Sequence, residues 1–278
     1  MATLKRYLNS AHIPLPIRDD WKRCIIATAE AGFDGIELLG AEFEDENRMD
    51  KNLLRVYAET ARNSGVKLSA HPFVEWAKYP VSLAQAKWKK LLDYCATMEA
   101  GEIIMHFAFL TDREQGWKRL YQILDPEIGF LASHNITLLF ENVPDHGIRE
   151  LGSETADFCE LFRHYGSDTP VMLNLDTGHA QIMGITRELT TQCGNRWLYT
   201  HIHDNNGIND SHSIPGTGVG NWDELALCAK NANYTGPLIM EYPNTEIPQA
   251  LPLLIKSFNK KGFLLAPLKN TFPDFKQA

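Results

Sequence analysis

The chain has 278 residues, 44% of them hydrophobic, and its 27 basic and 35 acidic side chains give a formal net charge of −8. This apolar fraction excludes a disordered chain, because burying that much apolar surface can offset the entropy lost on folding. The apolar runs are only about four to six residues long, too short to span a membrane. The acidic balance argues against a broad nucleic-acid-binding surface. The length is compatible with two domains or with one α/β barrel.

The number and spacing of the cysteines indicate whether the protein works in a reducing or an oxidising cellular compartment. There are five of them, an odd number, and they are scattered without any C-x-x-C spacing. We therefore expect reduced thiols and a cytoplasmic location, without membrane association. Lys5 and Arg6 precede no apolar h-region of the kind that a signal peptide has, so no signal peptide is expected.

Short apolar runs recur along the chain and predict strands. In chain order these are a weaker run at residues 7–13, then 34–39, 66–70, 102–106, 136–141, 171–176, 197–203 and 237–241. Most runs are apolar at both odd and even positions, which is typical of parallel strands covered on both faces.

Amphipathic segments between these runs predict helices. They cover residues 21–31, 52–64, 83–100, 221–232 and 251–258. Alternating strands and helices indicate a parallel sheet, and eight such units in about 250 residues match a (β/α)8 TIM barrel. We therefore expect an α/β barrel of one domain over residues 1–278, with residues 266–278 as a C-terminal tail.

An open doubly wound sheet is the alternative architecture. Its dinucleotide-binding form would carry G-x-G-x-x-G after an early strand, and this motif is absent. Gly216, Gly218 and Gly220 form a G-x-G-x-G late in a long loop, where a flexible loop is favoured over a phosphate cradle.

Nearly every predicted strand ends in a group able to bind a metal or transfer a proton. These are His12, Glu37, His71, His106, Glu141, Asp176, His201 and Glu241. Four of them, His71 to Asp176, follow one another at equal steps of 35 residues, one βα unit each. In a barrel such groups meet at the C-terminal mouth, where active sites of this fold lie. For His12 and Glu37, a purely structural role and a role in the site are given equal weight.

Carboxylates gathered in one mouth would repel one another without a cation. Glu141, Asp176, His201 and Glu241 suit a divalent ion such as Zn, Mn, Mg or Co, with one ion expected and up to three considered. His71 and His106 are candidates for a second ion bridged by Glu141. His179, Asp210 and His212 are candidates for a third, since two histidines and one aspartate are a typical zinc set. His203 has the same strand parity as His201, so spacing leaves both open.

Several segments together resemble the xylose isomerase-like barrel superfamily, which contains sugar and sugar-phosphate isomerases and epimerases and the endonuclease IV type of apurinic-site nuclease. The resemblance is carried by residues 32–37 (Gly-Phe-Asp-Gly-Ile-Glu), 140–142 (Phe-Glu-Asn), 175–180 (Leu-Asp-Thr-Gly-His-Ala), 201–204 (His-Ile-His-Asp), 210–218 (Asp-Ser-His-Ser-Ile-Pro-Gly-Thr-Gly) and 237–241 (Pro-Leu-Ile-Met-Glu). Their order and placement, from about residue 32 to 242, carry the resemblance.

In the epimerase branch the resemblance implies one divalent metal held by Glu141, Asp176, His201 and Glu241, with His201 chosen over His203 by the H-x-x-D pattern. In the nuclease branch it implies three zinc ions on nine positions, and acceptable residues occupy all of them. The nine are His71, His106, Glu141, Asp176, His179, His201, Asp210, His212 and Glu241.

The expected activity is therefore that of a metal-dependent sugar or sugar-phosphate isomerase or epimerase. Proton transfer next to a carbonyl would pass through a metal-stabilised enediolate, with Glu141 and Glu241 as acid and base. The expected partner is a small sugar or polyol, which Phe73, Trp76 and Tyr79 could stack against. A homodimer is considered, because such barrels often pair.

Two alternatives remain, a zinc phosphodiesterase acting on abasic DNA and a keto-cyclitol dehydratase of the same fold. Nucleic acid is not expected, because residues 41–51 hold five acids against two bases and residues 203–229 contain neither Lys nor Arg. The best-known ketose epimerases carry an Arg shortly after the strand-7 His, and this chain has none there, so their substrates are not carried over. The nearby basic candidates for phosphate are Lys78, Arg113 and Arg149.

Overall fold

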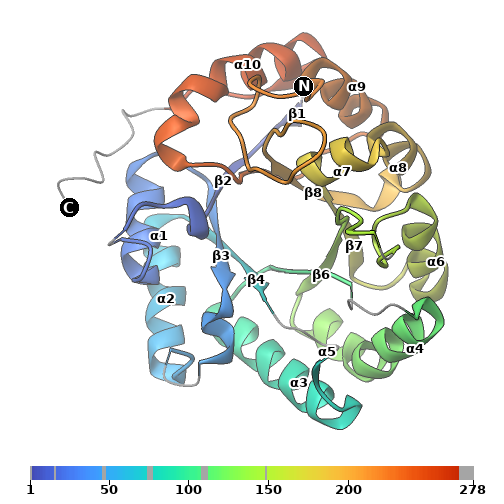
Figure 1. Ribbon diagram of the computed structural model, residues 1–278. Coiled ribbons are helices and arrows are strands. Elements are labelled where there is room, and N and C mark those ends of the chain that lie inside the picture. The colour runs from blue at the N-terminus through green and yellow to red at the C-terminus, as the bar shows by residue number, and fades with distance from the viewer. Residues whose placement is uncertain are drawn as a thin grey trace.

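The computed structural model describes residues 2–15, 17–45, 48–73, 78–107, 112–147 and 149–268. Within these residues, eight parallel strands close into a barrel in the sequential order β2-β3-β4-β5-β6-β7-β8-β9. The strands are β2 (Arg6–Asn9), β3 (Gly35–Gly40), β4 (Lys67–Pro72), β5 (Glu102–Met105), β6 (Thr137–Glu141), β7 (Val171–Asp176), β8 (Trp197–Ile202) and β9 (Leu238–Met240). The predicted (β/α)8 TIM barrel is confirmed, and its helices surround the strands (Figure 1).

Ten α-helices lie in the described part of the chain. They are α1 (Trp21–Glu30), α2 (Lys51–Ser64), α3 (Val81–Met98), α4 (Arg113–Leu124), α5 (Ile128–Ser133), α6 (Thr155–Tyr165), α7 (Thr177–Met183), α8 (Thr186–Gln192), α9 (Trp222–Asn231) and α10 (Ile247–Lys260). Short 3-10 turns are η1 (Ser10–His12), η2 (Ala41–Glu44), η4 (Asp125–Glu127), η5 (Gly194–Arg196) and η6 (Asn244–Glu246). The five predicted helices correspond to α1, α2, α3, α9 and α10, whereas the sequence did not predict α4 to α8.

The first predicted strand was too long. It ends at Asn9, whose side chain accepts a hydrogen bond from the Ala11 amide at 2.9 Å and starts the η1 turn. An Asx side chain offers the backbone this alternative to a sheet ladder. His12 therefore belongs to a turn at the barrel mouth, not to a strand.

A second, two-stranded sheet joins the beginning of the chain to the residues after α10. Strand β1 (Ala2–Thr3) pairs in parallel with β10 (Phe263–Leu264). The Arg6 guanidinium donates to the carbonyl oxygens of Gly32 and Ala266, at 3.2 and 3.1 Å. Of the predicted tail, residues 269–278 lie outside the described residues. No helix in the described segments has the length and hydropathy needed to cross a bilayer.

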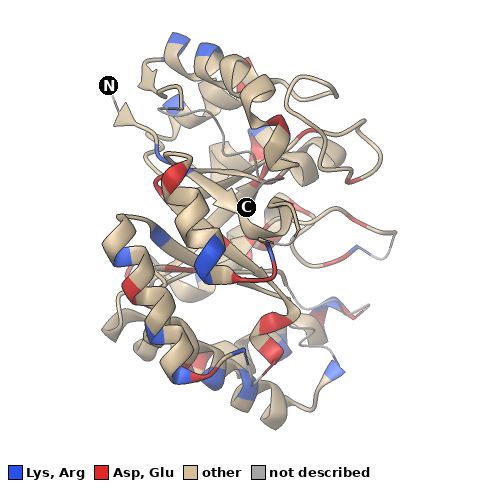
Figure 2. Ribbon diagram, turned by 90° about the vertical axis from the view of Figure 1, so that its left-hand side faces the viewer, with Lys and Arg blue, Asp and Glu red and all other residues tan. Residues whose placement is uncertain are grey.

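Inside the barrel, a small apolar cluster fills the space below the mouth. Its buried members are Tyr7, Ile104, Leu139, Tyr199 and Ile239, one from each of five strands. Side chains alternate across a strand, so the residue two positions further along points inward as well. Those next inward positions are Asn9, His106, Glu141, His201 and Glu241. Long loops extend from this end, and the N-terminus lies on the opposite side (Figure 2).

Candidate metal centre

Three carboxylates converge on one imidazole nitrogen at the barrel mouth. His201 Nδ1 lies 2.9 Å from Glu241 Oε2, 3.1 Å from Glu141 Oε2 and 3.7 Å from Asp176 Oδ2. All four side chains are buried. They come from β6, β7 and β8 and from the residue after β9, so the structure brings together the four residues predicted as one metal site.

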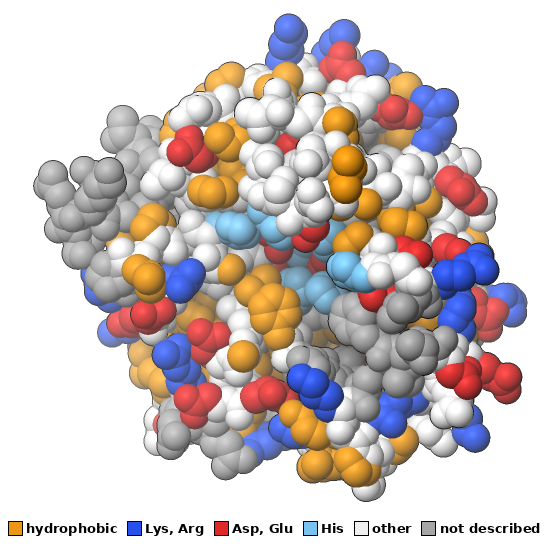
Figure 3. Space-filling view, viewed as in Figure 1, with side chains coloured by type: hydrophobic (Ala, Val, Ile, Leu, Met, Phe, Trp, Pro, Cys, Tyr) orange, Lys and Arg blue, Asp and Glu red, His pale blue; other side chains and the backbone are white. Residues whose placement is uncertain are grey.

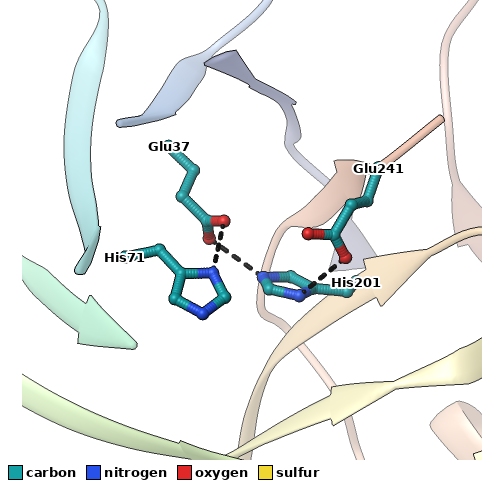
Figure 4. Close-up of side chains that lie close together, drawn as sticks. All are labelled: Glu37, His71, His201 and Glu241. Carbon is teal, nitrogen blue, oxygen red and sulfur yellow. Dashed lines mark hydrogen bonds and ion pairs between the residues drawn. The ribbon is translucent and has the colours of Figure 1, made fainter. Parts of the chain in front are cut away.

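Glu37 connects the central imidazole to a neighbouring strand. Its Oε2 lies 2.9 Å from His201 Nε2, and its Oε1 lies 3.1 Å from His71 Nδ1 (Figure 4). The Asn9 amide donates to Glu37 Oε1 at 2.8 Å and to Glu241 Oε1 at 3.0 Å. Glu37 thus has direct contacts with this cluster, a role that the sequence left undecided. Asn9 was missed, although its inward strand parity was a usable signal.

Other amides hold the remaining carboxylates. The Asn174 side chain donates to Glu141 Oε2 at 2.9 Å. The Asn142 side chain is hydrogen-bonded to the backbone N–H and carbonyl of Asp176. Both asparagines are buried, and the sequence predicted neither of them, because an amide at a strand end has no spacing signature of its own.

His71 and His106 approach the central cluster from β4 and from the residue after β5. His71 Nε2 lies 3.8 Å from Glu141 Oε2, and His106 Nε2 lies 3.3 Å from Glu141 Oε1. Their ring centroids are 5.1 Å apart. One nitrogen of each histidine and one Glu141 oxygen lie within 4.8 Å of one another, so these residues can hold a second cation.

A third group lies beside the first two. His179 Nε2 and His212 Nε2 approach the same oxygen, Asp210 Oδ2, at 3.1 and 3.3 Å. His203 Nε2 lies 3.0 Å from both Asp176 oxygens, and its ring stacks on His212 at 4.2 Å. His12 lies next to His212, with ring centroids 5.1 Å apart. In the space-filling view, histidines gather at the centre of this face with acidic side chains among them (Figure 3).

The charges of the central cluster depend on one another. Burial by itself raises the pKa of Glu37, but the charge of His201 and its hydrogen bonds outweigh burial and lower that pKa to about 2. Burial lowers the pKa of His201, and the charges of Glu241 and the other carboxylates reverse this and raise it well above its ordinary value. The pocket therefore favours positive charge at the point where the carboxylates meet.

The donor set fits a divalent cation. His201 Nδ1 and Glu241 Oε2 face each other as a buried ion pair, and neither of these atoms nor the buried His71 Nε2 makes a hydrogen bond. Ligand atoms about 2.1 Å from one ion would be about 3.0 Å apart at 90° and about 3.6 Å apart at 120°. The distances from His201 Nδ1 to the three carboxylates, 2.9 to 3.7 Å, cover this range. Three carboxylates with one imidazole suit Mn, Mg, Co or Zn.

The other candidate residues lie as follows. Phe73 is 46% exposed, and its ring lies 5.6 Å from that of His71. Tyr79 instead donates to Glu44 Oε1 at 3.3 Å, and Lys87 lies over its ring. Trp76 lies outside the described residues.

The arginines considered as phosphate anchors contact other parts of the chain. Arg113 pairs with the buried Asp157 and donates to the carbonyl oxygens of Arg149 and Glu150. The Arg149 guanidinium lies 3.0 Å from Glu154 Oε1. Both guanidinium groups therefore have anionic partners within the chain.

The barrel and the cluster at its mouth define a class, the TIM barrels with acidic and histidine side chains at their strand ends. The model of one family, described as "Xylose isomerase-like TIM barrel", matches residues 25–259, and the chain belongs to this family. A protein of Sinorhizobium fredii, "Uncharacterized protein y4fM", is 26% identical over 161 residues, which are 56% of this chain and 51% of that protein. The chain thus spans about half the length of this relative.

Solved structures show the same fold. A D-tagatose 3-epimerase-like protein superposes with a TM-score of 0.76 at 19% identity, covering 93% of this chain and 99% of that chain. A D-psicose 3-epimerase, crystallised in the presence of D-fructose, gives 0.72 at 19% identity, with coverages of 86% and 85%. The 3-keto-D-glucoside 4-epimerase YcjR from E. coli gives 0.66 at 15% identity, with coverages of 93% and 99%. At these identities the likeness concerns the fold.

Proposed function

We propose that the protein is a divalent-metal-dependent sugar isomerase or epimerase that moves a proton at a carbon next to a carbonyl. One observation carries the proposal: the carboxylates of Glu141, Asp176 and Glu241 converge on His201 Nδ1 at the mouth of the barrel. Proteins named as epimerases of tagatose, psicose and a 3-keto-glucoside have the same fold, and their names suggest the reaction class.

Asp176 and His201 would mainly hold the cation. A bound divalent ion would polarise the sugar carbonyl and make the neighbouring C–H more acidic. Asp176 Oδ1 accepts from the His179 amide at 2.7 Å, and His201 Nε2 contacts Glu37. These contacts hold both side chains in place before substrate enters, which is how surrounding groups orient metal ligands.

Glu141 and Glu241 would exchange the proton. They approach the substrate position from β6 and from the end of β9, three strands apart in the barrel order. One carboxylate removes the proton from the α-carbon, and the other returns a proton to the same or the opposite face. Burial alone would raise the pKa of the Glu141 carboxyl, but the positive charges of His201 and His106 outweigh burial and hold that pKa well below its ordinary value, which favours the ionised form that accepts a proton.

Deuterium exchange tests this proposal directly. The metal-loaded protein is incubated in heavy water with a panel of ketoses and cyclitols, and label at the α-carbon is measured by NMR and mass spectrometry. Exchange with at least one sugar, abolished by a chelator, is expected. Failure to label any member of the panel would reject the proposal. Elimination of water from a keto-cyclitol substrate, seen as a product lighter by one water, would instead identify a keto-cyclitol dehydratase.

A second candidate is a zinc phosphodiesterase acting on abasic DNA. It is favoured by the two further groups, His71 and His106 with Glu141, and His179 and His212 with Asp210. The acidic loops at the mouth oppose it, because a phosphate backbone would be repelled. Elemental analysis counts the ions per chain, and a nicking assay on an abasic duplex follows. Three zinc ions with no nicking would remove this candidate.

A further inference from the structure

Asp204 follows β8 and is buried at the base of the loop that leads to α9. Its carboxylate accepts four backbone N–H groups. Oδ2 accepts from Gly216 at 2.9 Å and from Gly218 at 3.1 Å, and Oδ1 accepts from Gly220 and Asn205, each at 2.9 Å. An ionised carboxylate has about four acceptor positions, so these four donors fill it.

The glycines are required by how closely the loop backbone approaches Asp204. A Cβ at position 218 would lie 2.5 Å from Asp204 Oδ1 and 2.0 Å from the Asn205 carbonyl oxygen. A Cβ at position 220 would lie 3.0 Å from Asp204 Oδ1. The G-x-G-x-G segment is therefore neither a free flexible loop nor a free phosphate cradle, because it is wound around a carboxylate of the same chain.

Convergent backbone N–H groups of this kind form anion sites in many proteins. Here the anion is supplied by the chain, so no N–H group of this set remains for a substrate phosphate. Two of the three basic residues considered for phosphate do not replace it, since Arg113 and Arg149 pair with Asp157 and Glu154. Residues 203–229 contain no Lys or Arg.

We propose that Asp204 is a resident anion that fills the glycine cradle at the barrel mouth, and that the site consequently takes sugars or polyols without a phosphate group. This inference rests on the proposed function for its substrate. It narrows that function, because the sequence did not decide whether the substrate carries a phosphate group.

Asp204 is also a positioning residue for the third group of the candidate centre. Its backbone forms two 2.8 Å hydrogen bonds with Ser213, which close the segment that carries Asp210 and His212. The ring of His212 is then held by a 2.9 Å contact between Nδ1 and the carbonyl oxygen of Glu241. Loosening the cradle should therefore move the side chains of this segment as well as its backbone.

The first test uses inorganic phosphate and chelator-treated protein labelled with 15N-glycine. The amide resonances of Gly216, Gly218 and Gly220 are expected to stay in place in the wild type as phosphate is added. A saturable shift of these three resonances would overturn the proposal, because it would show that the cradle accepts an external anion.

The second test compares Asp204→Asn with the matched surface change Asp223→Asn by hydrogen exchange. The NH2 group introduced at position 204 would face backbone N–H donors, so exchange over residues 213–220 should rise at least about tenfold, while the barrel strands keep their protection. Unchanged exchange in that loop would contradict the role of Asp204. Asp223 is half exposed and pairs with Lys260, and its variant should match the wild type.

The third test compares a turned-over ketose with its own phosphate ester. We expect kcat/KM for the free sugar to exceed that for the ester by at least about 100-fold. A kcat/KM for the phosphate ester that equals or exceeds that for the free sugar would overturn the proposal. If neither compound is turned over, the proposed function fails, whereas the phosphate titration and the exchange comparison still decide whether Asp204 fills the cradle.

Discussion

Replacing Glu37 by Gln should weaken metal binding without removing any of the four central ligands. Glu37 is fully buried and contacts His201 Nε2 at 2.9 Å, His71 Nδ1 at 3.1 Å and the Asn9 amide at 2.8 Å. With Nδ1 of His201 facing the carboxylates, the opposite nitrogen carries the hydrogen that Glu37 accepts. Glu37 thereby selects the tautomer and the ring orientation that present Nδ1 to the cation.

The size of the effect follows from the hydrogen bonds that a glutamine cannot make. Its side chain presents only one oxygen, so its NH2 group must face either the His201 N–H or the Asn9 amide donor. Removing the outer hydrogen-bond partner of a metal-binding histidine typically costs about 10- to 100-fold in affinity, or about 1.4 to 2.7 kcal/mol. We expect the Kd of Mn²⁺ or Zn²⁺ to rise by that factor.

The assay is competition between the protein and a chromophoric chelator, with thermal unfolding recorded for each variant. Glu188→Gln provides the matched control, since the same chemical change there lies on the outer helix α8. A folded Glu37→Gln protein whose affinity stays within about threefold of the wild type would refute the idea that Glu37 orients His201.

Three other residues give further predictions. Glu241→Gln should lower α-carbon exchange by about 10²- to 10⁴-fold, measured by NMR against the Glu188→Gln control. Burial raises the pKa of Glu102 to about 7, so the folded state loses stability as the pH rises from about 4.5 to 7. Glu102→Gln removes this loss. In urea titrations it should therefore raise the free energy of unfolding by at most about 3 kcal/mol at pH 8, and by little at pH 5. Gly178→Ala would place a Cβ 1.9 Å from His203 Cε1, so its crystal structure should show that ring displaced.

Each of these has a contradicting result. Full exchange activity in Glu241→Gln would remove that carboxylate from the proton transfer. Equal stability changes at pH 5 and pH 8 for Glu102→Gln would show that its titration does not affect folding. An unmoved His203 ring in Gly178→Ala would mean that the backbone of α7 yields instead.

The barrel order was predictable because parallel strands buried on both faces leave a simple signal, a short run of apolar residues. Residues 171–176 were predicted as a strand and match β7 (Val171–Asp176). Helices α7 and α8 were not predictable in this way, because seven-residue helices carry too few turns for a periodic apolar stripe. Helix α7 begins instead through one contact, in which the Asp176 side chain accepts from the His179 amide.

The site was partly predictable for a different reason. Acidic residues and histidines at successive strand ends stand out, and the closed barrel brings Glu141 and His201 to the same mouth. Glu37 was counted among the strand-end groups with its role left undecided, and the structure places it three residues before the end of β3. Asn9 and Asn174 were missed because their function comes from the carboxylates that they contact, and the inward strand parity of Asn9 was the one signal available for it.

Two carboxylates of the central cluster, those of Glu241 and Asp176, divide their two oxygens between different contacts. Glu241 accepts from Asn9 through Oε1 and faces His201 Nδ1 through Oε2. Asp176 accepts the His179 amide through Oδ1 and faces His201 through Oδ2. In each of these two carboxylates, one oxygen accepts a backbone or amide N–H and the other faces the common centre, although His203 Nε2 also lies 3.0 Å from both Asp176 oxygens. Because this arrangement forms when the chain folds, binding a cation would need little rearrangement of these side chains. Hydrogen bonds and ion pairs within the barrel offset the electrostatic repulsion between the gathered carboxylates.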